Sequence, residues 1–472
     1  MSGNPLASDG VVGKLKPEQE KALKEFWQEF FKLVDEAPEE GSGPKSKSDP
    51  SSGNEKEGGD IPKDDAAKEK MKAEEEMRNA RAAFEEYGRK RFVETAWRFV
   101  AMDDPDMDML RFLRARKWDT KRGVAMLCSC IKWRMDSDVE KIFEKGEEGM
   151  KDAEGFIKQM SMAKAYSQGT DHYGRPVVYI HVAKHRTFDQ SPKALEDFVL
   201  FQMENVRCLL ADRADKVTIV FDMTGFGIRN MDWRCILFIV KCLEAYYPES
   251  LNVMITHNAP WVFQGIWKVL SPMLDPVVRN KIQMTKNTDD LCTHIPKKHL
   301  IKQLGGDNSW EWKYQEIVPG ENEKQKDKET RKKLEKERAD LIGQYEEVTR
   351  EWMKQDKPSE ELVKKRKMLM HRMRAQYWEL DPYIRGRGCY HRHGNIVGNG
   401  LVYFEYPNQS ANNNADEWET IGYTSCREEN MMRAEALARE LGIEGDIAKK
   451  SGGGGEGDDG EGKKRKKKKS RA

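Results

Sequence analysis

The sequence predicts an α/β protein with an open mixed, largely parallel β-sheet, an N-terminal helical subdomain and a C-terminal helical-hairpin extension. Three observations support this prediction. Beyond Gly155, short apolar stretches of strand length alternate with stretches of helical periodicity. The unit from Val217 through a helix at about 232–247 to Leu251 has the spacing of a βαβ crossover, whose strands are parallel. Helical periodicity dominates on both sides of this region.

Five short apolar stretches are predicted to form the sheet. The first two flank a turn at 171–176 that contains Gly174 and Pro176, so they should form a hairpin. The third and fourth each follow a helix, expected at 192–212 and 232–247. The predicted strands are 160–166, 177–182, 217–221, 251–256 and 282–284.

Two helical patterns are expected before the sheet. Pro17 suits the first turn of an amphipathic helix that ends near Val34. This helix is expected to dock back onto the body of the protein. A second, longer helical pattern spans about 67–101 and ends before Pro105.

After Trp312 the chain is highly charged and has narrow apolar seams. Apolar residues from Leu334 to Trp352 recur in a heptad-like pattern, Pro358 interrupts it, and a second helix follows. This pattern predicts an antiparallel helical hairpin. The predicted divisions are an N-terminal amphipathic helix (1–36), a disordered linker (37–66), a helical subdomain (67–150), an α/β domain (155–306), an extension with the hairpin (307–445) and a disordered basic tail (446–472).

Composition excludes several classes of protein. The 472 residues include 82 Lys and Arg against 81 Asp and Glu, so the chain lacks the basic excess of a nucleic-acid-binding protein. No apolar run approaches the length of a membrane span, and the N-terminus does not resemble a signal peptide. We therefore expect a soluble, cytoplasmic protein.

The eight cysteines show no regular spacing and are expected to be reduced core residues. Cys389, His391 and His393 could point the same way on an extended strand and bind a metal. The Gly-rich sequence around them favours a polar turn instead, so no metal site is predicted.

The catalytic motifs that we sought are absent from the sequence. Gly225-Phe226-Gly227 follows a strand, but Asn230 occupies the place of the third glycine of a dinucleotide fingerprint. Asp222 ends that strand without an evident histidine or carboxylate partner, which favours a turn or cap role. The prediction is a protein that is not an enzyme; a nucleotide-dependent enzyme using the 225–227 turn is the rival.

The helix expected after Asn258-Ala259-Pro260 has an unusually wide apolar face. Its apolar residues cover an arc of about 160°, whereas a surface helix needs only about 100°. Two interpretations remain open: another domain covers the helix, or the helix is a lid over a large apolar cavity. The candidate lid residues are Trp261, Phe263, Ile266, Trp267, Leu270 and Met273.

A basic cluster of Arg111, Arg114, Arg116 and Lys117 follows Leu110. Such a cluster is most often a solvated helix face. At the mouth of an apolar cavity it could instead bind a lipid phosphate, because charge-assisted donors must replace the water around the headgroup. A cavity is needed because exposing a 16-carbon acyl chain costs on the order of 12 kcal/mol.

Several motifs resemble the CRAL-TRIO lipid-binding family, and they occur in the family's order over about residues 100–306. These motifs are LRFLRARKWD (110–119), DHYGRPVVYIHV (171–182), TIVFDMTGFG (218–227), YYPESLNVMITHNAPWVFQGIW (246–267) and HIPKKHLIKQLGG (294–306). The closest likeness is to fungal phosphatidylinositol transfer proteins with long terminal extensions. The resemblance implies a CRAL-TRIO fold whose pocket holds one lipid and is closed by a movable helix.

The resemblance also implies headgroup-binding residues. Arg116 and Lys117 match a basic pair, Glu249 a glutamate and Lys281 a lysine that hold the phosphate and inositol, while Asp171 matches an acidic residue near the inositol. This sequence departs from the family at two places. Val278 replaces a threonine of the phosphate site. Gly227 and Arg229 replace hydroxyl residues of the choline-lipid site, so any second lipid is unidentified.

Together these features predict a phosphatidylinositol transfer protein that exchanges a phospholipid between membranes through a gated hydrophobic pocket. The bound phospholipid is the ligand, and no cofactor or metal is expected. Transient peripheral association with endoplasmic reticulum, Golgi, endosome or lipid-droplet membranes is expected. The alternative is a non-catalytic, lipid-gated scaffold that presents phosphatidylinositol to a lipid kinase, or a carrier of another hydrophobic ligand such as a sterol. The basic run at 463–469 could contact an anionic membrane, act as a nuclear import signal or remain solvated.

Overall fold

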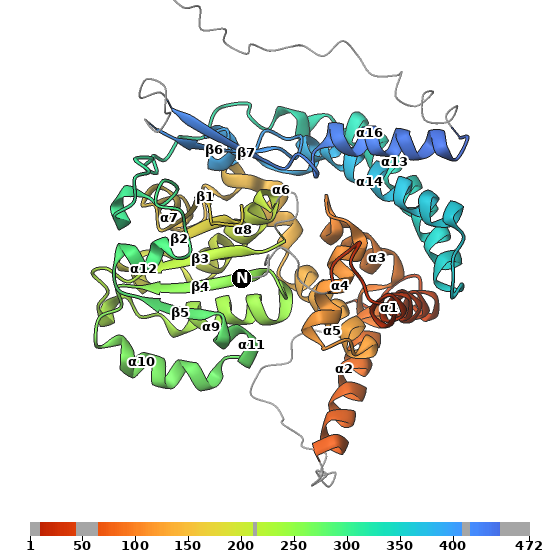
Figure 1. Cartoon of the computed structure of the whole chain (residues 1–472), viewed down its shortest axis with the longest axis horizontal. Coiled ribbons are helices and arrows are strands. Elements are labelled where there is room, and N and C mark those ends of the chain that lie inside the picture. The colour runs from red at the N-terminus through yellow and green to blue at the C-terminus, as the bar shows by residue number, and fades with distance from the viewer. Residues whose placement is uncertain (1–9, 44–64, 211–214, 408–415, 444–472) are drawn as a thin grey trace, which may run out of the picture.

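The computed structural model describes residues 10–43, 65–210, 215–407 and 416–443. Figure 1 shows a sheet covered by helices, a group of N-terminal helices beside it, and a C-terminal extension that runs along both. Residues 44–64 of the predicted linker and the whole predicted tail (446–472) lie outside the described residues.

The central sheet has five strands in the order β1-β2-β3-β4-β5. The first two strands pair antiparallel, and each later pair is parallel, as the βαβ spacing predicts. The fold-class prediction is therefore confirmed. The strands are β1 (Ala165–Thr170), β2 (Pro176–His181), β3 (Val217–Asp222), β4 (Leu251–His257) and β5 (Ile282–Thr285).

The first strand begins later than the sequence predicts. Residues Phe156–Ser161 form the short helix α7, and the strand β1 starts only at Ala165. A short apolar run does not distinguish a buried helix from a buried strand, and here its first residues pack as a helix against the α8 helix (Pro192–Leu209).

The two faces of the sheet are covered by different elements. On one face, Val177, Tyr179 and Val220 pack against residues of the segment 291–304, which includes α12 (Thr288–Cys292). The other face carries Val178 and Ile219. The helices over that second face are α8, α9 (Trp233–Lys241), which continues as a π-helical turn (Cys242–Tyr246), and α10 (Phe263–Leu270), followed by α11 (Pro276–Asn280).

The N-terminal helix docks on the body as expected. Its buried face consists mainly of large side chains, among them Phe26, Trp27 and Phe31. The indole N–H of Trp27 donates to Asp106, 2.8 Å away. The N-terminal helices are α1 (Pro17–Glu36), α2 (Asp65–Tyr87), α3 (Arg89–Val100), α4 (Pro105–Ala115), α5 (Thr120–Asp136) and α6 (Val139–Met150).

The helical pattern at 67–101 forms two helices, α2 and α3, instead of one. Gly88 lies between them with φ +76°, a conformation that L side chains rarely adopt. A Cβ on Gly88 would lie 2.5 Å from the backbone nitrogen of Gly41. Ser42 also donates its backbone N–H to Glu85 of α2. Residues 41–43 of the predicted disordered linker are therefore held against the body.

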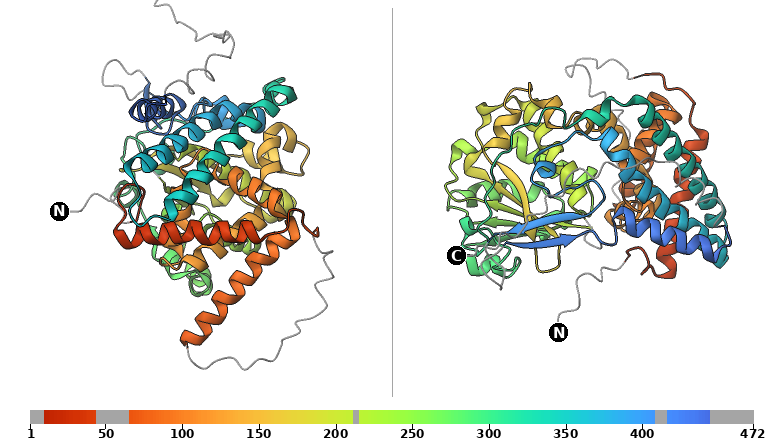
Figure 2. Two further views of the ribbon diagram at one scale, coloured as in Figure 1. Left: turned by 90° about the vertical axis from the view of Figure 1, so that its right-hand side faces the viewer. Right: turned by 90° about the horizontal axis from the view of Figure 1, so that it is seen from above.

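The predicted helical hairpin is present in the C-terminal extension. It consists of α13 (Lys328–Met353) and α14 (Glu360–Ile384), which extend beside the N-terminal helices as far as α1 (Figures 1 and 2). Both predicted apolar seams are buried, for example at Tyr345 and Leu369.

The extension also contains α15 (Cys389–Arg392), the antiparallel pair β6 (Val402–Tyr406) and β7 (Glu417–Ile421), and α16 (Arg427–Glu440), which packs on α14. Among the described residues, no helix is long and apolar enough to cross a bilayer.

Candidate functional site

A large cavity lies between one face of the sheet and the helices α8, α9 and α10. Its atom-free space, counting the open side, is about 1820 Å³. The walls are mainly aliphatic and aromatic, including Val178, Ile219, Phe221, Val199, Ile239 and Leu270. We call this space the lipid cavity, because only an apolar ligand can replace the water at such walls without losing hydrogen bonds.

The helix α10 forms one wall of the lipid cavity, and exposed apolar side chains flank it. Phe263, Trp267 and Leu270 line the cavity. Trp261 just before the helix is 84% exposed and Met273 just after it is 52% exposed. The interpretation that another domain covers this helix therefore fails in the described part of the chain. The structure instead has a helix with one apolar face on the cavity, a half-buried Ile266, and exposed apolar side chains just before and just after it.

Charged residues gather where the parallel strands begin. Lys216, Glu249–Ser250 and Lys281 precede β3, β4 and β5, and the amino ends of parallel strands meet at one edge of a sheet. The ammonium nitrogen of Lys281 lies 3.5 Å from the Glu249 carboxylate. The neighbouring Val217, Ser250 and Ile282 line the lipid cavity. This edge, which we call the amino edge, is thus a charged end of an apolar cavity.

Arg111 of α4 reaches this end of the cavity. Among the described residues, no carboxylate lies within hydrogen-bond distance of its guanidinium. It lines the lipid cavity, is 6% exposed, and its Nε has no hydrogen-bond partner among the described residues. The nearest carboxylate, that of Asp108, lies 4.0 Å away. Burial, reinforced by the negative charge of Asp103, raises the pKa of Asp108 to about 8. Burial thus opposes ionisation of the carboxyl nearest to Arg111, and that carboxyl lies beyond hydrogen-bond distance of the guanidinium.

Arg114 extends this cationic region. Its Nη2 forms an ion pair with the Asp215 carboxylate at 3.5 Å but no hydrogen bond, and its Nη1 donates to the carbonyl of Gly10. The charges of Glu249 and Lys216 lie close enough to interact with the Arg114 guanidinium. Arg111 and Arg114 belong to the basic cluster of the sequence, but the family resemblance implied headgroup roles only for Arg116 and Lys117 within it. Their spacing of three on one helix face was the available signal.

The structure places the five predicted headgroup residues in three groups. Glu249 and Lys281 lie together at the amino edge. Arg116, half-buried at the end of α4 with an unpartnered Nε, and the exposed Lys117 follow Arg114, and neither lines the cavity. Val278, which replaces the family's threonine, is part of the apolar wall.

Asp171 is engaged in a separate network away from the cavity lining. One carboxylate oxygen accepts the backbone N–H groups of Tyr173 and Arg175. The other accepts from the Thr218 hydroxyl at 2.9 Å and the Asn252 amide at 3.5 Å, and lies 3.6 Å from the Arg175 guanidinium. Asn252 is available for this contact because it bulges between the paired residues Leu251 and Val253 of β4. Asp171 thus ties the β1–β2 turn to two other strands.

The opposite end of the lipid cavity, at the carboxyl ends of the strands, is also polar. Lys164 donates to Gln190 at 2.9 Å and Gln159 at 3.2 Å, and contacts His185 Nδ1 at 3.3 Å. The other ring nitrogen of His185 lies 3.2 Å from the Asp232 carboxylate. These polar groups, unlike Arg111, have partners within the protein.

Asp222 has the histidine partner that the sequence analysis did not find. His181 Nδ1 lies 3.0 Å from the Asp222 carboxylate, and its Nε2 lies 3.2 Å from the Tyr166 hydroxyl. The pairing was hidden because the two residues are 41 positions apart and meet only through the parallel pairing of β2 with β3.

The Gly225–Gly227 turn is organised by Asn230. The Asn230 side chain accepts the backbone N–H of Gly227 and donates to the carbonyls of Ala183 and His185. Asn230 therefore closes the turn from inside, where a phosphate-binding loop would leave its N–H groups open.

Cys389, His391 and His393 lie in and just after a short helix instead of a strand. Cys389 is buried beside Glu147, and His393 Nε2 contacts the carbonyl of Lys313. Within the described ranges, no group of three or more His, Cys, Asp or Glu side chains is arranged to hold a metal ion.

Comparison with known proteins agrees with this architecture. Residues 160–306 match the family model of the CRAL/TRIO domain, and residues 22–129 match that of the CRAL/TRIO N-terminal domain. A CRAL-TRIO domain-containing protein of Schizosaccharomyces pombe is 39% identical over 302 residues, covering 64% of this chain and 68% of that protein. The phosphatidylinositol transfer protein CSR1 of Eremothecium gossypii is 34% identical over 306 residues, covering 64% and 70%. The SEC14 cytosolic factor of Kluyveromyces lactis is 27% identical over 221 residues, covering 43% and 70%. This chain belongs to the CRAL-TRIO domain family.

Proposed function

We propose that this protein extracts phosphatidylinositol from one membrane and delivers it to another, without making or breaking a bond. The observation that carries the proposal is the buried Arg111 guanidinium at the charged end of an apolar cavity, whose Nε has no hydrogen-bond partner among the described residues. The name of the relative CSR1, a phosphatidylinositol transfer protein, supports the same substrate.

The acyl chains occupy the lipid cavity in this proposal. Exposing each CH₂ group to water costs about 0.8 kcal/mol, so the cavity must replace the bilayer hydrocarbon that the two chains leave during extraction. The chains replace water along the walls formed by Ile219, Ile239 and Leu270. The polar group must then lie at an end of the cavity, because burial of an unpaired phosphate is prohibitive.

The headgroup lies at the amino edge. Arg111 and Arg114 donate charge-assisted hydrogen bonds to the phosphate, and Lys281 and Glu249 hold the phosphate and the inositol hydroxyls. Arg116 and Lys117 approach the same group from the solvent side. Asp171 supports this edge indirectly, through its contacts with Thr218 and Asn252.

The segment from Trp261 to Met273 is the gate. Its outward apolar residues, Trp261 and Met273, enter the interfacial region of a bilayer when the gate opens. The Glu244 carboxylate accepts the Asp275 backbone N–H at 2.6 Å and anchors the far end of the segment. The protein is thus a cytoplasmic carrier that meets membranes transiently.

A vesicle-to-vesicle transfer assay tests the headgroup site. Arg111→Met combined with Lys281→Met removes at least two charge-assisted hydrogen bonds, so we expect phosphatidylinositol transfer to fall about 100-fold. The matched control is Lys141→Met with Lys193→Met, two exposed lysines on α6 and α8. Unchanged transfer by the Arg111/Lys281 variant, with its circular dichroism intact, would reject the headgroup site.

A further inference from the structure

A second cavity lies where the C-terminal hairpin meets the N-terminal helices. Its atom-free space, counting the open side, is about 1350 Å³, and it is bounded by α3, α5, α6, α8, α13 and α14. Much of its wall is apolar, formed by Trp97, Phe143, Ile342, Tyr377, Leu380 and Ile384. We call it the seam cavity. It opens where Arg98 of α3 approaches Glu335 of α13, 4.0 Å apart and both partly exposed.

The seam cavity contains one buried cation that no carboxylate accompanies. Arg338 of α13 lines the cavity and is 7% exposed. It donates to the backbone carbonyls of Ala101 and Met373, and its guanidinium lies over the Tyr377 ring. No ion pair to Arg338 occurs within the part of the chain that the structure describes. Burial lowers its pKa to about 10, so it remains protonated at neutral pH.

The other buried charges of the seam cavity already have partners. Arg134 pairs with Glu140 and Glu204 at 2.7 and 2.8 Å. Arg385 pairs with Asp381 at 2.6 Å. Glu144 and Glu335 both pair with Arg331. Glu94 at the rim is exposed to water. Among the described residues that line the seam cavity, Arg338 is therefore the one buried cation without a carboxylate partner. An anion that enters the cavity would pair with it.

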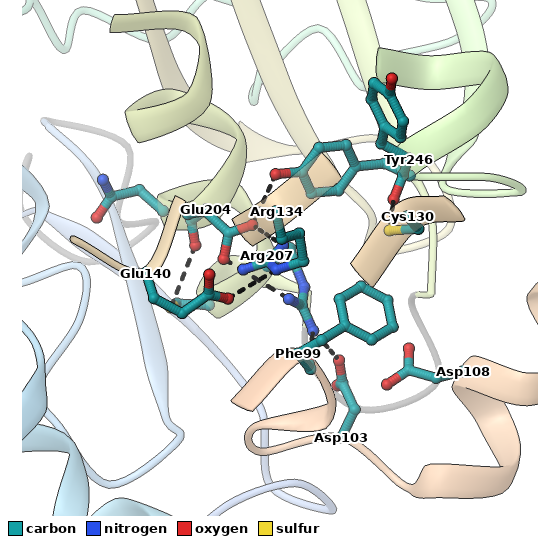
Figure 3. Close-up of polar contacts among 12 residues, drawn as sticks. Phe99, Asp103, Asp108, Cys130, Arg134, Glu140, Glu204, Arg207 and Tyr246 are labelled. Atoms are coloured by element: carbon teal, nitrogen blue, oxygen red, sulfur yellow. Dashed lines mark hydrogen bonds and ion pairs between the residues drawn. The ribbon is translucent and has the colours of Figure 1, made fainter. Parts of the chain in front are cut away.

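Paired charges around Arg134, Glu204 and Arg207 (Figure 3) include residues that line the seam cavity and one that lines both cavities. Arg207 borders both cavities, and it donates to Asp103 at 3.1 Å and to the Phe99 carbonyl at 2.7 Å. Glu204 borders the seam cavity and accepts from the hydroxyl of Tyr247, which borders the lipid cavity. The two cavities thus meet at a layer of paired side chains, and each has its own apolar lining.

We propose that the seam cavity is a second binding site, for an amphipathic anion. The apolar body of the ligand packs against Trp97, Ile342 and Leu380, and its carboxylate or phosphate pairs with Arg338. The pairing is favourable because a buried guanidinium without a counter-charge is costly, and an anion offsets that cost with a charge-assisted hydrogen bond. The site depends on the C-terminal extension, which supplies Arg338 and Ile342.

Calorimetric titration with ten-carbon probes tests the proposal on the full-length protein. The probes are decanoate, decyl phosphate and the uncharged decanol. Ile342→Trp fills the seam cavity, and Ile239→Trp fills the lipid cavity. The control Val363→Trp places the same bulk on α14 at a side chain that is 44% exposed and outside the cavity.

The proposal predicts a saturable site for decanoate, decyl phosphate or both. Ile239→Trp and Val363→Trp should retain this site, whereas Ile342→Trp should weaken its affinity at least about tenfold. Which anion binds tighter distinguishes a carboxylate ligand from a phosphate ligand. The wild type should bind the anion about tenfold more tightly than decanol, and Arg338→Met should abolish this difference in affinity. Loss of the site in Ile239→Trp but not in Ile342→Trp would assign all binding to the lipid cavity. Undiminished anion preference in folded Arg338→Met would show that Arg338 only caps α3. Either result overturns the proposal.

Discussion

The two polar ends of the lipid cavity differ in whether the protein supplies partners for their charges. At the carboxyl ends of the strands, Lys164 contacts three side chains and His185 contacts Asp232. Near the amino edge, one buried nitrogen each of Arg111, Arg114 and Arg116 has no hydrogen-bond partner among the described residues. A polar group whose hydrogen bonds the fold already satisfies contributes to the fold, whereas a buried cation with an unsatisfied N–H group indicates a place for an anionic ligand.

Substitution of Asp171 is expected to have the largest effect on stability. Both carboxylate oxygens of Asp171 have partners within the protein, and the residue lies near the amino edge. Asp171→Ala leaves Arg175, Thr218 and Asn252 without their shared acceptor. We expect the free energy of unfolding in urea to fall by about 3–5 kcal/mol. Transfer per folded molecule should change little. A stable variant that has lost phosphatidylinositol transfer would instead place Asp171 against the headgroup.

Lys164→Met tests the paired end and should cost about 1–3 kcal/mol, because Gln159, His185 and Gln190 lose their donor. Burial lowers the pKa of Lys164 to about 8, below its value in the unfolded chain. The unfolded chain therefore binds more protons between pH 8 and about 10.5, and the wild type should gain stability relative to the variant as pH rises through this window. Exposed Lys193→Met is the control. A pH-independent difference would mean that Lys164 is not desolvated.

Asp108→Asn tests the unpaired end. Because the pKa of Asp108 is raised to about 8 in the folded protein, the folded state binds more protons than the unfolded state from about pH 4 to 8. Wild-type stability should decline over this range, and the lipid-free variant should gain at least about 1 kcal/mol relative to it between pH 5 and 8. Chemical unfolding at several pH values measures this. A constant difference would indicate that Asp108 is ionised and compensates Arg111.

Trp261→Ala should have the smallest effect on stability, within about 0.5 kcal/mol, because the side chain is 84% exposed. Its binding to vesicles should weaken about tenfold if the ring enters the bilayer. Sedimentation with vesicles measures this binding. Trp267→Ala, on the cavity face of α10, is the matched variant and should destabilise the protein instead. Equal vesicle binding by Trp261→Ala and wild type would remove Trp261 from the gate.

The sequence was sufficient for the topology, because the topology follows from local periodicity and the βαβ spacing. The gate stays a prediction, and so does the headgroup role of Glu249 and Lys281, which came from the family resemblance; the structure brings these two side chains together. The sequence did not reveal the importance of Arg111. That importance depends on the raised pKa of Asp108, which results from burial in the folded protein. The His181–Asp222 pair and the seam cavity likewise require contacts between distant segments, which one sequence does not reveal.

The most direct test of the central claim is mass spectrometry of the lipid extracted from the purified full-length protein. The proposal predicts that phosphatidylinositol is recovered in near-stoichiometric amount, and that it is depleted from Arg111→Met/Lys281→Met but not from Lys164→Met. Recovery of a sterol or another uncharged lipid, with no phosphatidylinositol, would contradict the claim while leaving the fold unchanged.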